Sequence, residues 1–194
     1  TFTPRIMGKR GLLLGGEFRY LTDWYHSKLR AEILPYDHSQ NSREDSLRGA
    51  FSYQGTSFPI TRWQLDTDIN YASDRDYVKD LSNSLASSSS RHLERRGDLR
   101  YLGDDWEFLG RLQHFQTIDQ TIAPVDRPYA RLPQLFFQLE KEALGPLFAH
   151  LETEYVYFDL DDAVHGHRFD LRPGLSLQLE NSWGYLIPKI SGRY

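Results

Sequence analysis

The chemically active side chains of this sequence are numerous, but their spacing matches neither a catalytic site nor a metal site. Metal-ligand types gather in residues 159–167, Asp-Leu-Asp-Asp-Ala-Val-His-Gly-His, without the spacing of a calcium-binding EF-hand loop. The seven histidines are scattered, and no Gly-x-Ser-x-Gly motif presents a serine nucleophile. Because the 194 residues contain no cysteine, thiolate metal sites and disulfides are excluded within them. We predict no catalytic residue, no metal ligand and no cofactor, and we interpret residues 159–167 as a solvated loop.

Charged side chains form a second pattern, because they alternate with apolar residues over long segments. In one such segment Leu29 and Ile33 alternate with Lys28, Arg30 and Glu32. A period of two is typical of a β-strand whose two faces meet different surroundings. We predict that one face of the sheet meets lipid and that the other lines a lumen. The charged candidates for the lumen face are Glu17, Arg19, Lys28, Arg30, Glu32, Asp66, Asp68, Arg100, Arg111, Glu154, Asp170 and Arg172.

Residues 127–140 begin with a segment that contains two prolines and then show the same alternation of apolar and polar residues. The apolar face takes Leu135 and Leu139, whereas Gln138 lies on the polar face. Phe136 is the exception, since it is an apolar side chain on the predicted lumen face.

Composition limits the classes of protein to which the chain can belong. The net charge of −4 gives no support for nucleic-acid binding. Mean hydropathy is −0.60, and no apolar run approaches the roughly 18 residues of a membrane helix, which excludes a helical membrane protein. A membrane barrel stays open, because half of each strand is polar. The aromatic content of 14% favours β structure.

The alternating segments predict an all-β fold of about eleven antiparallel strands. The breaks between them alternate between short and long, as in an up-and-down transmembrane β-barrel with short turns at one end. Trp63, Tyr71, Tyr155 and Tyr157 lie at strand ends, where aromatic residues form girdles at the membrane interfaces. About eleven strands do not close a wide barrel, so we expect an open, curved sheet with two unpaired edges. A start inside the alternating pattern suggests a fragment, and we treat residues 1–194 as a single segment of a barrel domain.

Three segments then carry a resemblance to a known family. Residues 7–21 read MGKRGLLLGGEFRYL, residues 73–81 read SDRDYVKDL and residues 128–135 read PYARLPQL. In this order they resemble segments of the LPS-assembly outer-membrane protein family (LptD, also called Imp or OstA). The alternation extends the resemblance to Tyr194.

The resemblance implies a location and partners. It implies an integral barrel of the Gram-negative outer membrane that inserts lipopolysaccharide into the outer leaflet, with the plug lipoprotein LptE inside the barrel. A periplasmic domain that receives lipopolysaccharide from the periplasmic transport bridge would precede Thr1, and further strands would follow Tyr194. The resemblance also implies that the family's disulfides join the parts that precede Thr1 and follow Tyr194. It further implies a protein without catalytic activity or a cofactor of its own. Phe136 is a candidate for contact with this plug.

Pro4 is the sharpest single candidate. Proline cannot donate a hydrogen bond to a neighbouring strand, so it weakens strand pairing. In the family, prolines of the first strands are associated with a lateral opening toward the membrane, and residues 3–5 resemble one of these positions. The alternative is an edge or bulge proline without a gating role.

Two other functions remain open from the residues alone. A general outer-membrane porin would show steady ion conductance, whereas a plugged assembly barrel would conduct little. A soluble β-sandwich would stay monomeric without detergent, but it gives no reason for loop lengths to alternate.

Overall fold

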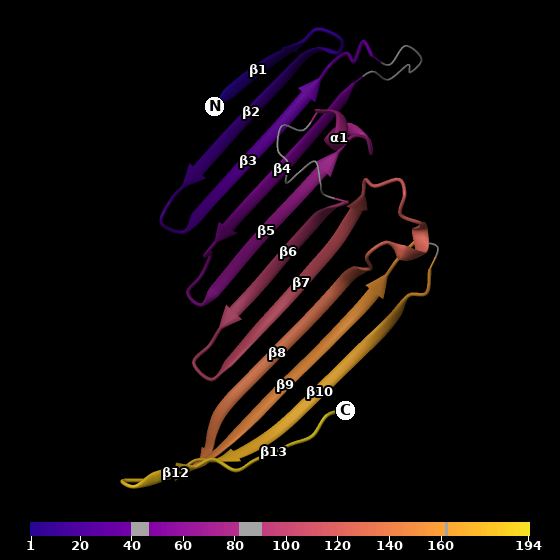
Figure 1. The fold of residues 1–194 in the computed structure, drawn as a ribbon. Coiled ribbons are helices and arrows are strands. Elements are labelled where there is room, and N and C mark those ends of the chain that lie inside the picture. The colour runs from indigo at the N-terminus through magenta and orange to yellow at the C-terminus, as the bar shows by residue number, and fades with distance from the viewer. Residues whose placement is uncertain (40–46, 82–90, 162) are drawn as a thin grey trace.

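The computed structural model describes residues 1–39, 47–81, 91–161 and 163–194 as one broad sheet (Figure 1). The sheet has eleven strands in the order β1-β2-β3-β4-β5-β6-β7-β8-β9-β10-β13. Their bounds are β1 Phe2–Met7, β2 Gly11–Leu21, β3 Tyr25–Leu34, β4 Arg48–Ser57, β5 Trp63–Ala72, β6 His92–Leu102, β7 Trp106–Thr117, β8 Ala130–Leu144, β9 Leu147–Asp159, β10 Gly166–Leu177 and β13 Lys189–Ser191. The prediction of an all-β, antiparallel fold with eleven strands is confirmed.

Each strand pairs antiparallel with its neighbour in sequence, apart from the step from β10 to β13. Within the described residues β1 and β13 lie at opposite edges of the sheet and do not pair with each other, so the sheet is open (Figure 1).

The connections differ in length at the two ends of the strands. Residues 22–24, 58–62, 103–105 and 145–146 make short turns at one end. Residues 35–47, 73–91, 118–129 and 160–165 make the longer connections at the other end, together with helix α1 and a single 3₁₀ turn, η1 (Pro124–Asp126) (Figure 1). We call these the short-turn end and the long-loop end.

Helix α1 (Tyr77–Leu81) is a short exception to the predicted all-β fold. Five residues are too few to show a helical period, so the pattern could not reveal it. Tyr77, Val78 and Leu81 pack with Leu13 and Leu34 of the sheet in the one cluster of buried apolar residues found in the described part of the chain. No helix among the described residues is long and apolar enough to cross a membrane.

The chain between β10 and β13 also differs from expectation. The alternation of apolar and polar residues continues to Glu180, but β10 ends at Leu177, and a separate hairpin of β11 (Leu179–Asn181) and β12 (Gly184–Leu186) follows. The cause is that β10 runs out of a partner: Leu177 lies opposite Leu147, the first residue of β9, and the last hydrogen bond of this ladder, from the Gln178 N–H to the Pro146 carbonyl at 2.7 Å, already reaches the turn before β9.

Candidate functional site

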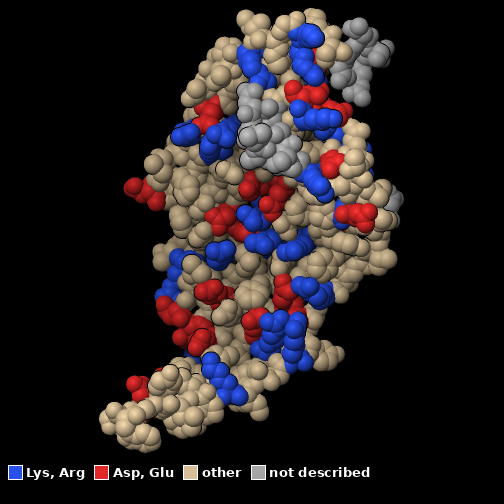
Figure 2. Space-filling model, in the orientation of Figure 1, with Lys and Arg blue, Asp and Glu red and all other residues tan. Residues whose placement is uncertain are grey.

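The register of the sheet decides which side chains share a face. Residues directly opposite one another in an antiparallel pair point to the same side. Glu17 lies opposite Arg30, Asp68 lies opposite Arg96, and Glu154 lies opposite Asp170. Followed from β2 to β10, the pairs place all twelve predicted lumen residues on one side, which we call the charged face. Figure 2 shows basic and acidic side chains interspersed over this side of the molecule.

The twelve predicted residues of the charged face are balanced in charge, and several of them form ion pairs. Six of them are basic and six are acidic. Glu17 pairs with Arg30 and with Arg19, and the Arg172 guanidinium lies 3.1 Å from Asp170. Such pairs on an exposed strand surface are weak, so they favour register more than overall stability.

Further charged residues belong to this face and were missing from the predicted set, among them Asp98, Arg168 and Glu152. Asp98 accepts two hydrogen bonds from Arg111 at 2.8 and 2.7 Å and is almost fully buried. Arg168 pairs with Glu154, and Glu152 pairs with Arg172 at 2.8 Å. The same alternation carries all three, so the sequence pattern contained the signal that would have found them.

Phe136 does lie on the charged face. Its cross-strand partners are Leu109 on β7 and Glu154 on β9. Leu109 is itself apolar on this face, so the two side chains form a small apolar patch within a polar surface.

The opposite side, which we call the apolar face, carries large hydrophobic residues that are exposed. Those exposed on the strands of this side are Leu12, Phe18, Tyr20, Leu29, Ile33, Phe51, Leu65, Tyr71, Leu99, Trp106, Leu112, Leu135, Phe169 and Leu175. Monomeric soluble proteins rarely expose a contiguous apolar surface of this extent.

Aromatic rings gather near both ends of the apolar face. Near the short-turn end, Trp63, Tyr101, Trp106 and Phe137 form a row across four strands, with successive ring centroids 5.1, 4.3 and 5.8 Å apart. Near the long-loop end, the rings of Tyr155 and Tyr157 lie 5.9 and 4.8 Å from that of His167, and the Phe51 and Tyr71 rings are 5.7 Å apart. The predicted aromatic positions therefore fall in two bands.

An ion-pair cluster ties α1 to the sheet at the long-loop end. This cluster, the ionic clamp, consists of Arg10, Asp37, Arg48, Asp74 and Asp80. The Arg48 guanidinium reaches Asp37 at 2.8 Å, Asp74 at 2.7 Å and Asp80 at 3.1 Å. Arg10 reaches Asp37 at 2.9 Å and Asp80 at 3.1 Å. The Asp37 side chain is fully buried and that of Arg48 is 5% exposed, so water contributes little to their solvation.

The electrostatics of the clamp favour ionised carboxylates. Burial opposes the charge on Asp37, but hydrogen bonds from Ser39, Arg48 and Arg10 outweigh it and hold its pKa well below the usual range. Asp74 behaves alike, because hydrogen bonds from Arg48 and Ser73 overcome its burial and lower its pKa.

Helix α1 makes three further contacts beyond the clamp. The Tyr77 hydroxyl donates to Glu32 at 3.1 Å, and Arg5 donates to the Leu81 carbonyl at 2.8 Å. Burial, together with the nearby Glu32 carboxylate, raises the pKa of Tyr77, so this phenol stays neutral. The Arg48 guanidinium also lies over the Tyr77 ring, 5.8 Å from its centroid. Helix α1 therefore packs over the charged face of the first strands.

Pro4 occupies the edge strand β1, opposite Leu14 of β2. Thr1 and Glu17 exchange both backbone hydrogen bonds, at 2.8 and 2.6 Å. Bonded and non-bonded pairs alternate along an antiparallel ladder, so the Pro4–Leu14 pair is a non-bonded one. The ladder to β2 therefore loses no hydrogen bond at Pro4. The donor that proline lacks would have pointed away from β2, to the other edge of β1.

In the part of the chain that the structure describes, no group of three or more His, Asp or Glu side chains is placed to hold a metal ion. The predicted loop 159–167 includes residue 162, which lies outside the described residues.

Comparison with known proteins assigns the chain to a family. The sequence model of LptD, LPS transport system D, matches residues 46–194. Proteins named LPS-assembly protein LptD are 39% identical over 97% of this chain in Alcanivorax borkumensis, 38% over its whole length in Nitrosococcus oceani and 40% over 98% in Aromatoleum aromaticum. The matched regions cover 25%, 26% and 24% of those relatives, so the chain spans about a quarter of their length. The resemblance seen in residues 7–21, 73–81 and 128–135 is thus confirmed, and the chain belongs to the LptD family of LPS transport proteins.

Proposed function

We propose that this chain is a transmembrane segment of a larger outer-membrane β-barrel that takes part in delivering lipopolysaccharide to the outer leaflet. The observation that carries the proposal is the division of the sheet into two faces. Uncovered hydrophobic residues on one side and paired charges on the other match a wall between lipid and a polar lumen. The two aromatic bands support it, since amphipathic rings favour the two membrane interfaces.

The charged face is then the lumen wall, with the twelve predicted residues as candidates for contact. The mixture of basic and acidic residues on this face suits the passage of phosphorylated sugar while acyl chains remain in lipid. The same face, with its Leu109 and Phe136 patch, is where a plug lipoprotein such as LptE would lie. A periplasmic domain before Thr1, which receives lipopolysaccharide from the transport bridge, and further strands after Tyr194 complete the proposed architecture.

Pro4 is proposed as part of a lateral opening at the free edge of β1. Pro4 has no backbone N–H, so a strand that pairs with this edge would have one carbonyl group without a donor. The pairing at this edge would therefore be weaker than the pairing between the other strands. An edge of this kind is where a lipid would leave a barrel sideways.

Depletion of the full-length protein from cells tests the function. We expect lipopolysaccharide to disappear from the cell surface, and we expect the purified protein with its lipoprotein partner to conduct few ions in planar bilayers. A general porin would instead show steady conductance, and its loss would leave surface lipopolysaccharide unchanged. Either result would overturn the proposal.

A further inference from the structure

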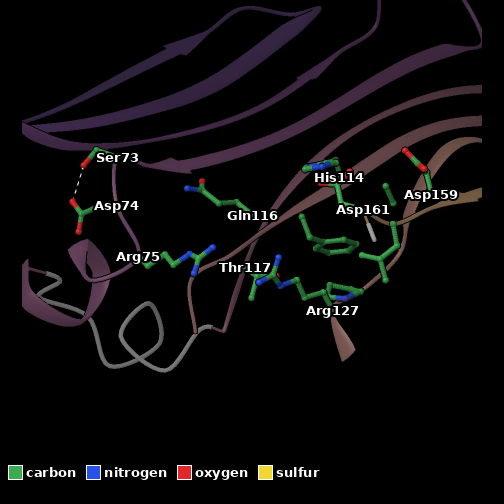
Figure 3. A pocket seen from close by; sticks show the side chains of 13 residues that line it. Ser73, Asp74, Arg75, His114, Gln116, Thr117, Arg127, Asp159 and Asp161 are labelled. Carbon is green, nitrogen blue, oxygen red and sulfur yellow. Dashed lines mark hydrogen bonds between the residues drawn. The ribbon is translucent and has the colours of Figure 1, made fainter. Parts of the chain in front are cut away.

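A pocket of about 360 Å³ opens at the long-loop end of the sheet (Figure 3). It lies between the segment that follows β5, the end of β7, the approach to β8 and the loop that follows β9. Its volume lies within the range of small-molecule sites. Nothing described above accounts for it.

Several polar groups around the pocket already have partners. Asp74 is bound by Arg48. The Gln116 amide exchanges hydrogen bonds with the Ala72 backbone at 3.2 and 2.7 Å. The Thr117 hydroxyl lies 3.0 Å from the His92 ring. These groups form the wall and leave other residues to meet a ligand.

Two arginines of the pocket are without such partners. Neither Arg75 nor Arg127 forms an ion pair with any residue that the structure describes, and the buried Nε of Arg127 has no hydrogen-bond partner. In Figure 3 their side chains extend toward one another from two sides of the pocket. Two guanidinium groups that point toward each other with no carboxylate between them repel each other. A bound anion would offset this repulsion and would accept the hydrogen bond that the Arg127 Nε–H lacks.

The other side of the pocket has the opposite character. Asp159 and Asp161 line it and have no ion-pair partner among the described residues (Figure 3). Carboxylates in this situation accept hydrogen bonds from hydroxyl groups. Phe115 adds an apolar ring to the lining. An anion alone would use the arginines and leave the carboxylates unsatisfied.

We propose that this pocket binds a saccharide that carries a phosphate or carboxylate group. Arg75 and Arg127 hold the anionic group, and Asp159 and Asp161 accept hydrogen bonds from the sugar hydroxyls. The inference rests on the proposed function, which brings a phosphorylated saccharide to this end of the sheet. It adds a specific docking point outside the twelve charged-face residues.

Calorimetry on the full-length protein with its lipoprotein partner, in detergent, tests the site. The probe is the phosphorylated oligosaccharide released from lipopolysaccharide by deacylation. We expect Arg75→Gln with Arg127→Gln to raise its Kd by about tenfold or more, because charge-assisted hydrogen bonds are lost. Enzymatic removal of the phosphates should weaken binding to the unaltered protein by a similar factor. Asp159→Asn with Asp161→Asn should also weaken binding.

Arg91→Gln is the matched control. Arg91 lies at the same end of the sheet but outside the pocket, its side chain is 72% exposed, and its ion pair with Asp119 is long at 3.7 Å. We expect the Arg91→Gln protein to bind the oligosaccharide with the same Kd as the unaltered protein. The single variant Arg75→Gln, at an exposed position, checks the result should the double variant fold poorly.

Two results would overturn the inference. One is an unchanged Kd in the double arginine variant. The other is inorganic phosphate binding as tightly as the oligosaccharide, which would show an anion site without saccharide recognition. Depletion in cells tests the broader function separately. If depletion removes lipopolysaccharide from the cell surface but the pocket binds no oligosaccharide, only the inference about the pocket is refuted.

Discussion

At the residue scale, two positions have effects that their local sequence does not explain. Pro4 matters through the direction of a missing donor, which points to the open edge of β1 and away from β2. Arg48 matters because it shares a buried environment with Asp37 while also reaching Asp74 and Asp80. Each position therefore supports a single-substitution test.

Pro4→Ala restores a backbone N–H at the free edge of β1. We expect tighter pairing across that edge and slower delivery of lipopolysaccharide, measured as pulse-labelled lipopolysaccharide reaching the cell surface. Pro59→Ala, in a short turn outside the strands, is the control and should leave delivery unchanged. Equal delivery rates for the two variants would contradict a gating role.

Arg48→Met removes the principal partner of a buried carboxylate. An uncompensated buried charge costs about 3–5 kcal/mol, so we expect α1 to detach from the sheet. Hydrogen exchange at the amides of residues 77–81 would then accelerate strongly. Arg62→Met serves as the comparison, because the Arg62–Asp104 pair is largely exposed at the short-turn end, and it should leave α1 protected.

At the scale of elements, α1 is a short helix held by long-range contacts. Its five residues are below the length at which a helix is stable alone. The clamp, the Tyr77 hydroxyl and the apolar contacts with Leu13 and Leu34 supply what the helix lacks. Its docking should therefore respond to whatever neutralises the clamp.

Acid should release α1 only at low pH. Asp37 and Asp74 have lowered pKa values in the folded protein, whereas unfolded aspartate titrates near 3.9. Their contribution is complete above the unfolded pKa and disappears as pH falls through the lowered folded pKa. We expect exchange protection of residues 77–81 to stay constant from pH 8 to pH 5 and to fall below about pH 4. Loss of protection already between pH 8 and pH 5 would contradict the assignment to these carboxylates.

At the scale of the whole molecule, the two faces determine where a charge is tolerated. Adjacent positions in β8 allow a matched comparison, since Leu135 lies on the apolar face and Phe136 on the charged face. Leu135→Arg should destabilise the protein folded in lipid vesicles by about 2–4 kcal/mol, as for other charges placed against lipid. Phe136→Arg, beside Glu154, should fold nearly normally. Urea titration of the vesicle-embedded protein measures both, and equal stabilities would argue against a membrane wall.

The sequence predicted the faces well because each strand repeats the same constraint at every second residue. Lys28, Arg30 and Glu32 could be assigned to one side without knowing any partner strand. Helix α1 could not be predicted, since its stability comes from residues as distant as Arg10 and Asp80. The pocket was missed for the same reason, because Arg75, Arg127 and Asp161 meet only after three separate connections have folded. The orientation of Pro4 needed the register of β1 on β2.

The clamp also has a consequence for the order in which the chain assembles. Its members come from the β1–β2 turn, the start of the β3–β4 loop, β4, the connection after β5 and α1, all within residues 10–80. The first five strands and α1 can therefore bury most of the apolar cluster around Leu13, Leu34 and Tyr77 before β8, β9 and β10 are paired. Ile118 joins this cluster later. We expect this N-terminal part to behave as a cooperative folding unit that nucleates the sheet, with the remaining strands added one hairpin at a time.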